Sequence, residues 1–425
     1  MSELETGPGA ELPVPLPDLP VVEEMQLGIV TRFADVKLQK AQGKPAVYCS
    51  VLMPKEILLA MDVATVYSDM LGAYASIMGM SEKYCQAAEE AGLSRDVCAV
   101  HRCTVGVANA AQRDDFFEMA FAVPDLVIGS NYPCMSESKS FLQVVDRYKT
   151  PYYFLDAPIN QWGQDVPQHV IDYYVLQLQG MIDFLVAHGH TFDLDRLKEE
   201  VAFTKRLNTL LQEVDLYKRA VPTPLRAYDN VIATTAPIAL SKEARTLAIF
   251  ERYRDELKAR VARGFGVVPE EKLRLMWVGM PPLCDFKLLN YPEAHGAVVA
   301  KSMLEFLTGF TLDPALMDPD KPLESIARAQ LVSPANPLYK SVIDYLVNAT
   351  RDYRIDGVIS VVKRSCGFLP GMQRLTKEAI LEATGVPSLV FDMDGVDVRE
   401  YDPAATKANL DAFIETLLAR KKRGA

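Results

Sequence analysis

The sequence predicts an α/β protein with two parallel-sheet domains, because stretches in one half of the chain resemble stretches in the other. In the first pair, at 125–134 and 356–366, a short run rich in Val and Ile ends in polar residues and one cysteine. Such runs are typical of buried strands. Two more pairs of strand-like runs follow the same order, 150–156 with 386–392 and 44–54 with 275–282. We interpret the halves as Rossmann-like domains related by internal duplication, with a helical connector between them.

The length of the chain also favours more than one domain. At 425 residues it exceeds the size at which a single hydrophobic core keeps growing. We divide it into an N-terminal arm and helix at 1–43, a first α/β domain at 44–190, a helical connector at 191–265 and a second α/β domain at 266–425. Residues 1–20 are rich in Pro, Gly and acids, which predicts a flexible arm, and the apolar spacing of 21–43 predicts a helix.

The first domain is expected to alternate strands with helices. Short apolar runs predict strands at 44–54, 125–131 and 151–156. The apolar segment after the first strand, through Met80, predicts one or two helices. Further helices are expected at 98–111 and over the apolar positions 170–185, the latter ending at Gly189. This alternation is typical of a parallel sheet.

The connector and the second domain follow the same logic. A long helix is expected to open at 191 with acids in its first turn, Pro222 and Pro224 interrupt it, and another helix is expected over 241–263. In the second domain we expect strands near 273–279, 296–300, 357–362 and 387–391, and a final helix over 403–419.

Bulk composition excludes several classes of protein. The formal net charge is −11 and no basic stripe interleaves with aromatic residues, which argues against nucleic-acid binding. The basic residues at 420–423 are interpreted as a solvated helix end. No apolar run approaches about 18 residues, so we expect no membrane span. Seven scattered cysteines, an odd number, argue against a disulfide framework and favour a cytoplasmic protein.

Three cysteines are candidate metal ligands: Cys98, Cys134 and Cys366. The last two follow predicted strands, at the edge where open α/β sheets bind ligands. Thiolates bind soft metals and iron–sulfur clusters, and three thiolates would leave one iron open to a substrate. Their spacing is not that of a compact ferredoxin motif, and composition alone favours three buried, unrelated cysteines.

Motifs that occur in order along the chain carry a resemblance to a known family. They are Cys98-x-x-x-Arg102-x-x-x-Gly106, Asn131-x-Pro-Cys134 with Lys139 after it, Asp356–Gly–Val–Ile with Cys366, and Gly385–Val–Pro with Asp392-x-Asp394. From about residue 44 to near its end, the chain resembles the 2-hydroxyacyl-CoA dehydratase/benzoyl-CoA reductase family.

The resemblance implies two Rossmann-like domains, a helical part, and a [4Fe–4S] cluster held by three cysteines. By match to the motifs, the ligands here would be Cys98, Cys134 and Cys366. Cys103 stands about one helical turn beyond the first of them and could be the ligand in its place. Met135 occupies a position where relatives often carry an aspartate, so a role of that carboxylate in dehydration is in doubt.

The resemblance also implies a function. It implies a cytosolic enzyme subunit, paired with a homologous second subunit, that passes electrons from an ATP-hydrolysing iron–sulfur activator protein to an acyl-CoA thioester. This sequence carries no Gly-x-x-x-x-Gly-Lys-Ser/Thr loop, so the ATPase is expected to be another chain. We favour a benzoyl-CoA reductase subunit that forms a cyclic diene. The alternatives are a 2-hydroxyacyl-CoA dehydratase acting through a ketyl radical and a double-cubane reductase of small molecules.

Two interpretations from other classes of protein stay open. The chain could be a cluster-free α/β binding protein or a zinc-stapled structural subunit. Iron and labile sulfide in the protein purified without oxygen distinguish these from an iron–sulfur subunit.

Some residues near the motifs have two interpretations each. His101 and Arg102 could protonate a substrate or bind a phosphate, but a pair on a helix surface is favoured. Trp277 closes a predicted strand and fits the wall of a substrate pocket as well as it fits the core.

Charged residues near predicted strand ends are treated in the same way. Arg147, Lys363 and Arg364 could meet the phosphates of coenzyme A, although surface charge is the favoured interpretation. Asp392 and Asp394 resemble the nucleophile motif of haloacid-dehalogenase-type phosphatases, but too few residues follow for such a domain. We expect these two carboxylates to cap a turn or to face the cofactor.

Overall fold

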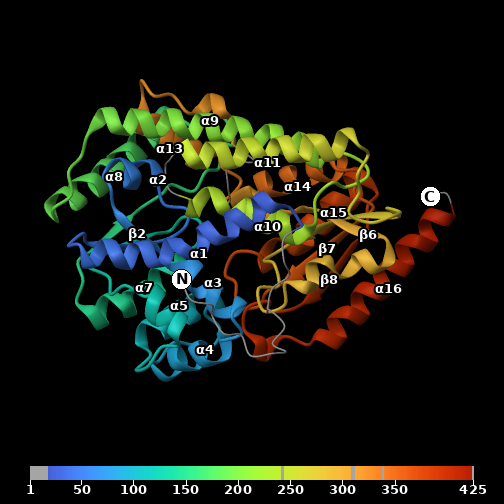
Figure 1. The fold of residues 1–425 in the computed structure, drawn as a ribbon, viewed down its shortest axis with the longest axis horizontal. Coiled ribbons are helices and arrows are strands. Elements are labelled where there is room, and N and C mark those ends of the chain that lie inside the picture. Colours follow the sequence, from blue (N-terminus) through green and yellow to red (C-terminus); the bar gives the residue numbers. More distant parts are fainter. Residues whose placement is uncertain (1–17, 241–243, 308–311, 337–338, 424–425) are drawn as a thin grey trace.

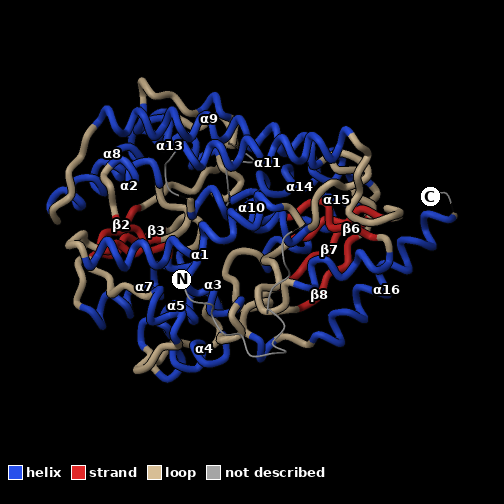
Figure 2. Tube along the Cα trace, in the orientation of Figure 1, coloured by secondary structure: helices blue, strands red, loops and turns tan. Residues whose placement is uncertain are grey.

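The computed structural model describes residues 18–240, 244–307, 312–336 and 339–423 (Figure 1). Two sheets lie toward opposite ends of the long axis of the molecule, with helices around them (Figure 2). The arm predicted over residues 1–20 lies outside the described residues up to position 17, as do positions 241–243 at the start of one predicted helix.

Both sheets are four-stranded and wholly parallel in the described residues. The first contains β1 (Ala46–Cys49), β2 (Ala64–Tyr67), β3 (Leu126–Ser130) and β4 (Tyr152–Leu155) in the order β2-β1-β3-β4. The second contains β5 (Leu273–Val278), β6 (Ala297–Ser302), β7 (Gly357–Val362) and β8 (Ser388–Asp392) in the order β6-β5-β7-β8. The α/β class is confirmed, and the shared order agrees with the predicted duplication, which stays a prediction.

An aspartate before the third strand of each sheet explains part of the sequence similarity. The carboxylate of Asp125 accepts a hydrogen bond of 2.8 Å from the backbone N–H of Ala46, at the start of β1. The carboxylate of Asp356 accepts one of 2.8 Å from the N–H of Arg274 in β5. Each aspartate also donates its own N–H to the carbonyl of the same partner. The repeated residue therefore fixes the start of the central strand pair in both sheets.

Helices of the first half surround the first sheet. They are α1 (Pro20–Ala41), α2 (Lys55–Ala60), α3 (Ser68–Ile77), α4 (Ser81–Glu90), α5 (Ala99–Asn109), α6 (Asp115–Ala120), α7 (Met135–Tyr148) and α8 (Gln168–Ala187). By length and composition α8 could cross a membrane, which we did not expect from the sequence. Here it packs on α13 and β4 through residues such as Leu178 and Met181, which are buried.

The remaining helices form the connector and cover the second sheet. They are α9 (Leu194–Lys218), α10 (Ala227–Ala239), α11 (Ala244–Ala262), α12 (Lys287–Asn290), α13 (Pro322–Val332), α14 (Tyr339–Asp352), α15 (Gln373–Thr384) and α16 (Pro403–Lys422). Short 3₁₀ turns are η1 (Tyr291–His295), η2 (Met303–Leu307), η4 (Pro314–Leu316), η5 (Pro370–Met372) and η6 (Val398–Glu400). As expected, α9 opens with an acidic cap, in which Asp193 accepts from two backbone N–H groups.

One prediction about the first domain was wrong. The segment after β1 was expected to be wholly helical through Met80, but it contains β2, in which Thr65 and Val66 are β-branched. Only four residues long, β2 gives too short a pattern to recognise, and its parallel pairing with β1 decides its structure.

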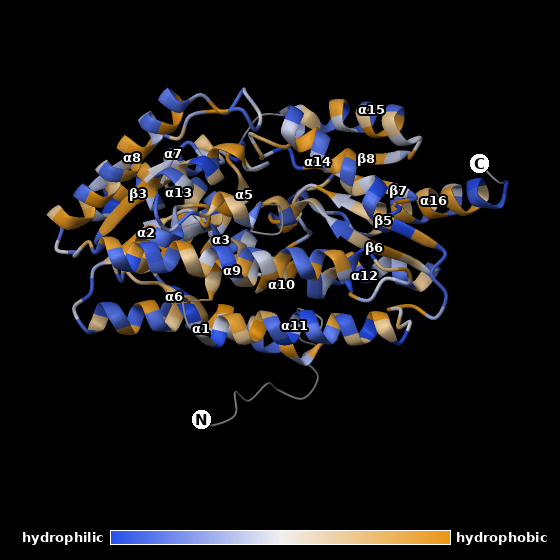
Figure 3. Ribbon diagram, turned by 90° about the horizontal axis from the view of Figure 1, so that it is seen from above, coloured by the Kyte–Doolittle hydropathy of each residue, from blue (hydrophilic) through white to orange (hydrophobic). Residues whose placement is uncertain are grey.

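The hydrophobic core is continuous between the halves. One cluster contains Val127 of β3, Trp277 of β5 and residues of α10 such as Val231. Figure 3 shows α1 and α11 in a layer beside α9 and α10, which follows from the packing of α11 on α9 and of α1 on α10. The connector therefore packs on both halves, and the domain boundaries at 43, 190 and 265 stay predictions.

Candidate active site

The carboxyl ends of the two sheets are the natural place to search for a site. In each sheet the chain order reverses beside the central strand, between β1 and β3 and between β5 and β7. Loops that leave such a pair diverge and open a crevice for a ligand. Cys134 lies between the end of β3 and the start of α7, which follows it directly, and Cys366 lies in the loop after β7. Both cysteines are therefore at the crevice edge, as predicted.

Helix α5 brings Cys98 to the same place. Cys98 is the residue before the helix, which packs closely on α3 and α4. A Cβ atom on Gly106 would lie 1.8 Å from the carbonyl oxygen of Tyr84, and one on Gly72 would lie 2.1 Å from that of Val100. Only glycine fits at these contacts, which explains Gly106 in the sequence motif.

Direct contacts join the surroundings of Cys98 and Cys366. The Nζ atom of Lys363 lies 3.4 Å from the Sγ atom of Cys98, while the carbonyl of Lys363 accepts the N–H of Cys366 at 2.9 Å. The backbone N–H of Ala99 donates to the Oγ atom of Ser365 at 3.4 Å. The site is thus assembled from both halves of the chain.

The three thiols lie close enough to influence one another's ionisation. Burial raises the pKa of the Cys134 thiol to about 12, and repulsion from Cys98 and Cys366 adds to the shift. Burial and repulsion from Cys98 also raise the pKa of Cys366. All seven cysteines are free thiols. Without a bound cation Cys134 and Cys366 are therefore protonated, and a metal centre would displace those protons.

Cys103 points elsewhere. Its Sγ atom lies 3.5 Å from that of Cys85 on α4, and both side chains are fully buried. Cys98, in contrast, lies beside Lys363 and acts electrostatically on Cys134 and Cys366. Which of Cys98 and Cys103 is a ligand stays a prediction. Among the described residues no three His, Cys, Asp or Glu side chains lie close enough to hold a single metal ion.

The interpretation of His101 and Arg102 as a helix-surface pair was wrong, since both side chains are buried. Burial and the nearby charge of Lys363 lower the pKa of His101 to about 3, so the imidazole is neutral. The guanidinium of Arg102 contacts Glu89 at 2.7 Å and Asp397 at 2.9 Å. It therefore joins α4 and α5 to the loop after β8.

In that loop Asp394 caps a turn, as expected, whereas Asp392, the last residue of β8, is exposed and lies 3.4 Å from Arg364. The side chain of Asp394 accepts a hydrogen bond of 2.6 Å from the Ser365 hydroxyl and bonds of 2.9 and 3.2 Å from the N–H groups of Val396 and Asp397. The carbonyl of Val396 accepts from Ser76 on α3 at 2.7 Å. Asp394 thus holds the loop against both the Cys366 loop and the first half.

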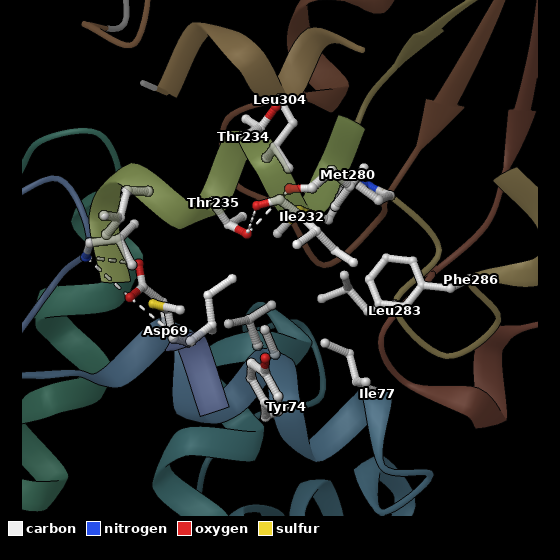
Figure 4. A pocket seen from close by; sticks show the side chains of 18 of the residues that line it. Asp69, Tyr74, Ile77, Ile232, Thr234, Thr235, Met280, Leu283, Phe286 and Leu304 are labelled. Atoms are coloured by element: carbon white, nitrogen blue, oxygen red, sulfur yellow. Dashed lines mark hydrogen bonds between the residues drawn. The ribbon is translucent and has the colours of Figure 1, made fainter. Parts of the chain in front are cut away.

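An apolar cavity of about 190 Å³ lies between the two halves of the chain (Figure 4), and Val100, two residues after Cys98, is one of its lining residues. Its walls come from α1, α3, α10 and the loops after β1 and β5, with Val100 of α5 linking it to Cys98. The aromatic wall residues are Tyr74, Tyr228 and Phe286, and Asp69 is the charged residue at its edge. The cavity is therefore lined mainly by apolar and aromatic side chains with one carboxyl group.

Asp69 and Glu137 form an acid pair that sequence reasoning missed. Burial raises the pKa of Asp69 to about 6, although the N–H of Val51 donates to its carboxylate at 3.1 Å. Burial, with repulsion from Asp69, raises the pKa of Glu137 well above its usual value. The hydroxyl of Ser50 donates to Asp69 at 3.4 Å, and that of Ser68 donates to Glu137 at 3.5 Å. The pair retains an exchangeable proton near neutral pH.

The sequence pattern of the family described as 2-hydroxyglutaryl-CoA dehydratase, D-component, matches residues 50–417. The chain belongs to this family. Its relatives include the lactoyl-CoA dehydratase subunit alpha of Anaerotignum propionicum, which is 24% identical over 91% of this chain and 93% of the relative. One of the benzoyl-CoA reductase subunits of Thauera aromatica is 27% identical over 80% of each chain. The (R)-2-hydroxyisocaproyl-CoA dehydratase alpha subunit of Clostridioides difficile is 22% identical over 93% and 95%.

The resemblance inferred from the motifs is confirmed at the level of the family. In this member of the 2-hydroxyglutaryl-CoA dehydratase D-component family, Met135 is the first residue of α7 and its side chain is 42% exposed. Trp277 is a core residue whose indole N–H donates to the carbonyl of Met280 at 3.2 Å. The cavity wall is formed instead by the loop that follows β5, including Met280 and Leu283.

The three basic residues that could meet the phosphates of coenzyme A, Arg147, Lys363 and Arg364, have different environments in this family member. Arg147 lies in the last turn of α7 and is exposed, at the end of the helix farther from Cys134. Arg364 is exposed and lies 3.4 Å from Asp392. Lys363 is buried, and its Nζ atom lies near Cys98. Surface charge is therefore the correct interpretation for the two arginines and the wrong one for the lysine.

Proposed function

We propose that the chain is the iron–sulfur subunit of an ATP-dependent benzoyl-CoA reductase. The overall reaction adds two electrons and two protons to the aromatic ring and leaves the thioester bond intact, giving a cyclic dienoyl-CoA. The electrons come from an ATP-hydrolysing iron–sulfur activator protein, and a homologous second subunit completes the complex. Family membership and the relatives named as subunits support this proposal.

The apolar cavity is the observation that supports an aromatic acyl-CoA as the substrate. A cavity of about 150 Å³ lined by similar side chains is large enough to hold benzene. The cavity here has about 190 Å³, with Tyr74, Tyr228 and Phe286 in its walls. It therefore accommodates a six-membered ring, and aromatic side chains can contact the ring through edge or offset stacking.

The residues at the crevice suit an iron–sulfur cluster. Cys98, Cys134 and Cys366 would hold it, and the support is that Cys98 acts electrostatically on both other thiols and that all three are buried or partly buried. When bound, such a cluster supplies low-potential one-electron chemistry. The protein contributes the donor set, the buried surroundings and an adjacent cavity reached by Val100.

The acid pair supplies the proton chemistry. Asp69 lines the cavity, and Glu137 lies close enough for repulsion from Asp69 to contribute to its raised pKa. At neutral pH the pair holds a proton, chiefly on Glu137 because its pKa is raised further than that of Asp69, and Asp69 can pass this proton to a carbon or oxygen atom of the substrate as negative charge develops there. Glu137 and the hydroxyl of Ser50 position that carboxyl group.

A 2-hydroxyacyl-CoA dehydratase is the second candidate. Three dehydratase alpha subunits among the relatives favour it, since each matches 90% or more of this chain. The same acid pair could then protonate a departing hydroxyl group. A double-cubane reductase of small molecules is a third member of the same class.

Anaerobic purification of the intact complex tests the proposal. We expect about four irons and equal labile sulfide per chain, and loss of benzoyl-CoA that requires activator, reductant and ATP. Four irons with turnover of a 2-hydroxyacyl-CoA in place of benzoyl-CoA would favour the dehydratase. A colourless, iron-free protein under strict anaerobiosis contradicts the whole redox proposal.

Cysteine variants test the ligand assignment. Alanine at Cys134 or Cys366 is expected to abolish iron binding, because each removes one of three thiolates. Cys103→Ala is the matched control, since that thiol faces Cys85 and should leave the iron content unchanged. Iron loss in Cys103→Ala with retention in Cys98→Ala would reverse the assignment.

A further inference from the structure

Lys363 is a buried cation aimed at the cysteines. Its side chain is 2% exposed, and its Nζ atom lies 3.4 Å from Cys98 Sγ and 3.9 Å from Asp394 Oδ1. It follows β7 directly, in the loop that also carries Cys366. A long charged side chain is rarely buried to this extent without a partner of opposite charge.

The nearby charges leave Lys363 to face the thiols. The carboxylate of Asp394 accepts a hydrogen bond of 2.6 Å from Ser365 and bonds from two backbone N–H groups, which spread its charge. The guanidinium of Arg102 is directed to Glu89 and Asp397. Lys363 therefore has the Cys98 sulfur as its nearest charged or ionisable contact.

The position has an electrostatic consequence for any redox centre held by these thiols. Each electron that enters such a centre adds one negative charge, and a buried ammonium group stabilises that charge more strongly than a solvated one does. Hydrogen bonds donated to cluster sulfurs act in the same direction.

We propose that Lys363 is a tuning residue of the iron–sulfur site, whose fixed positive charge beside Cys98 makes the bound cluster easier to reduce. This inference depends on the proposed function, because it requires a cluster on Cys98, Cys134 and Cys366. The electron comes from the external reductant, here the activator protein or dithionite, and one electron enters the cluster. Lys363 keeps its proton throughout, so no bond is made or broken at the lysine.

The chain offers a matched control in the next residue. Arg364 carries the same charge, but its side chain is 73% exposed and lies 3.4 Å from Asp392. Water and salt screen a charge in that position. Neutralising Arg364 changes the net charge of the protein as much as neutralising Lys363 does, without removing a cation from the thiols.

The midpoint potential of the cluster, measured in the anaerobically purified complex by redox titration with electron paramagnetic resonance detection, tests the inference. We expect Lys363→Met and Lys363→Gln to shift the potential to more negative values, Lys363→Arg to restore it most of the way, and Arg364→Met to leave it unchanged. The Gln variant keeps a hydrogen-bond donor without the charge, so it separates the two contributions.

The possible outcomes distinguish this inference from the proposed function. A wild-type complex without a reducible cluster overturns both. A cluster whose potential is the same in wild type, Lys363→Met and Lys363→Gln overturns the inference and leaves the proposed function standing. An equal shift in Arg364→Met, or loss of iron in all three Lys363 variants, also overturns it, because the effect would then be one of net charge or of folding.

Discussion

Two regions of this molecule bury ionisable groups in different ways. Near the cysteines, the acid pair of Asp69 and Glu137 is held by hydroxyl and backbone donors, with pKa values raised by burial. Behind β6, an ion cluster of two lysines and two acids is closed by direct contacts: Lys218 to Glu305 at 2.6 Å, Lys301 to Glu305 at 2.7 Å and Lys301 to Asp215 at 2.9 Å.

The difference indicates that the ion cluster stabilises the fold and that the acid pair takes part in the reaction. Ions that contact one another in a buried site keep their charges fixed and hold the elements that carry them, here α9, β6 and η2. Carboxyl groups without such compensation retain a proton that can move. The ion cluster should therefore matter for stability, and the acid pair for turnover.

The largest expected effect is a loss of turnover when a residue of the acid pair is replaced. Asp69→Asn should lower the rate of acyl-CoA turnover by about 10²–10⁴-fold, because the amide cannot donate a proton in place of the carboxyl group. Iron content should stay close to wild type. Turnover within a factor of about three of wild type, measured with saturating activator and ATP, would remove Asp69 from the mechanism.

The next effect is on stability in the ion cluster. Glu305→Gln should lower the free energy of unfolding by about 3–5 kcal/mol, since it leaves Lys218 and Lys301 buried with less compensating charge. Denaturant titration measures the change. The control is Glu324→Gln, which removes a partly exposed pair with Arg328 at 3.3 Å and should cost less than about 1 kcal/mol. Equal losses in the two variants would contradict the comparison.

A smaller effect, on the KM for the substrate, is expected when the cavity is altered and the acid pair is left intact. Ala73 on α3 lines the cavity, and Ala73→Leu should fill part of it. The KM for benzoyl-CoA should rise about 10-fold, the usual cost of one or two excess methylenes in a fitted pocket, while the proton chemistry of Asp69 is retained. Unchanged kinetics for the aromatic substrate would show that its ring binds elsewhere.

The smallest expected effect is the pH dependence of stability. The pKa of Asp69 is raised by burial to about 6 in the folded protein, against about 3.9 in unfolded chains. The folded state therefore binds more protons between these values, so Asp69 lowers stability as pH rises from about 4 to about 6. In the wild type, Asp69 should lower the free energy of unfolding by about 1–2 kcal/mol between about pH 4.5 and about pH 7.5. In Asp69→Asn this part of the pH dependence should be absent.

The ion cluster provides the opposite pH dependence. Burial alone would raise the pKa of Asp215, but attraction to Lys301 and Lys218 outweighs burial and lowers it. Its contribution to stability is therefore lost on acidification, as pH falls through the lowered pKa. A parallel pH dependence in wild type and Asp69→Asn would contradict the assignment of the loss at higher pH to Asp69.

Much of the fold could be predicted because its signals are local. Short apolar runs identified seven of the strands, and the aspartates at 125 and 356 recur because each fixes the start of a central strand pair. The exception, β2, gives no such signal in four residues. Helix α10 was likewise missed as a separate element, since it is apolar on most sides and buried among α1, α12 and β6.

The sequence by itself determined the family, the parallel sheets and the position of Cys134 and Cys366 at strand ends, because motif spacing and strand composition are properties of short segments. Only the tertiary structure decided that Cys103 lies against Cys85 and that Lys363 is buried beside Cys98. It alone also joined Asp69 to Glu137. Burial, mutual orientation and pKa depend on which distant segments meet, and that information is not contained in any one stretch of the chain.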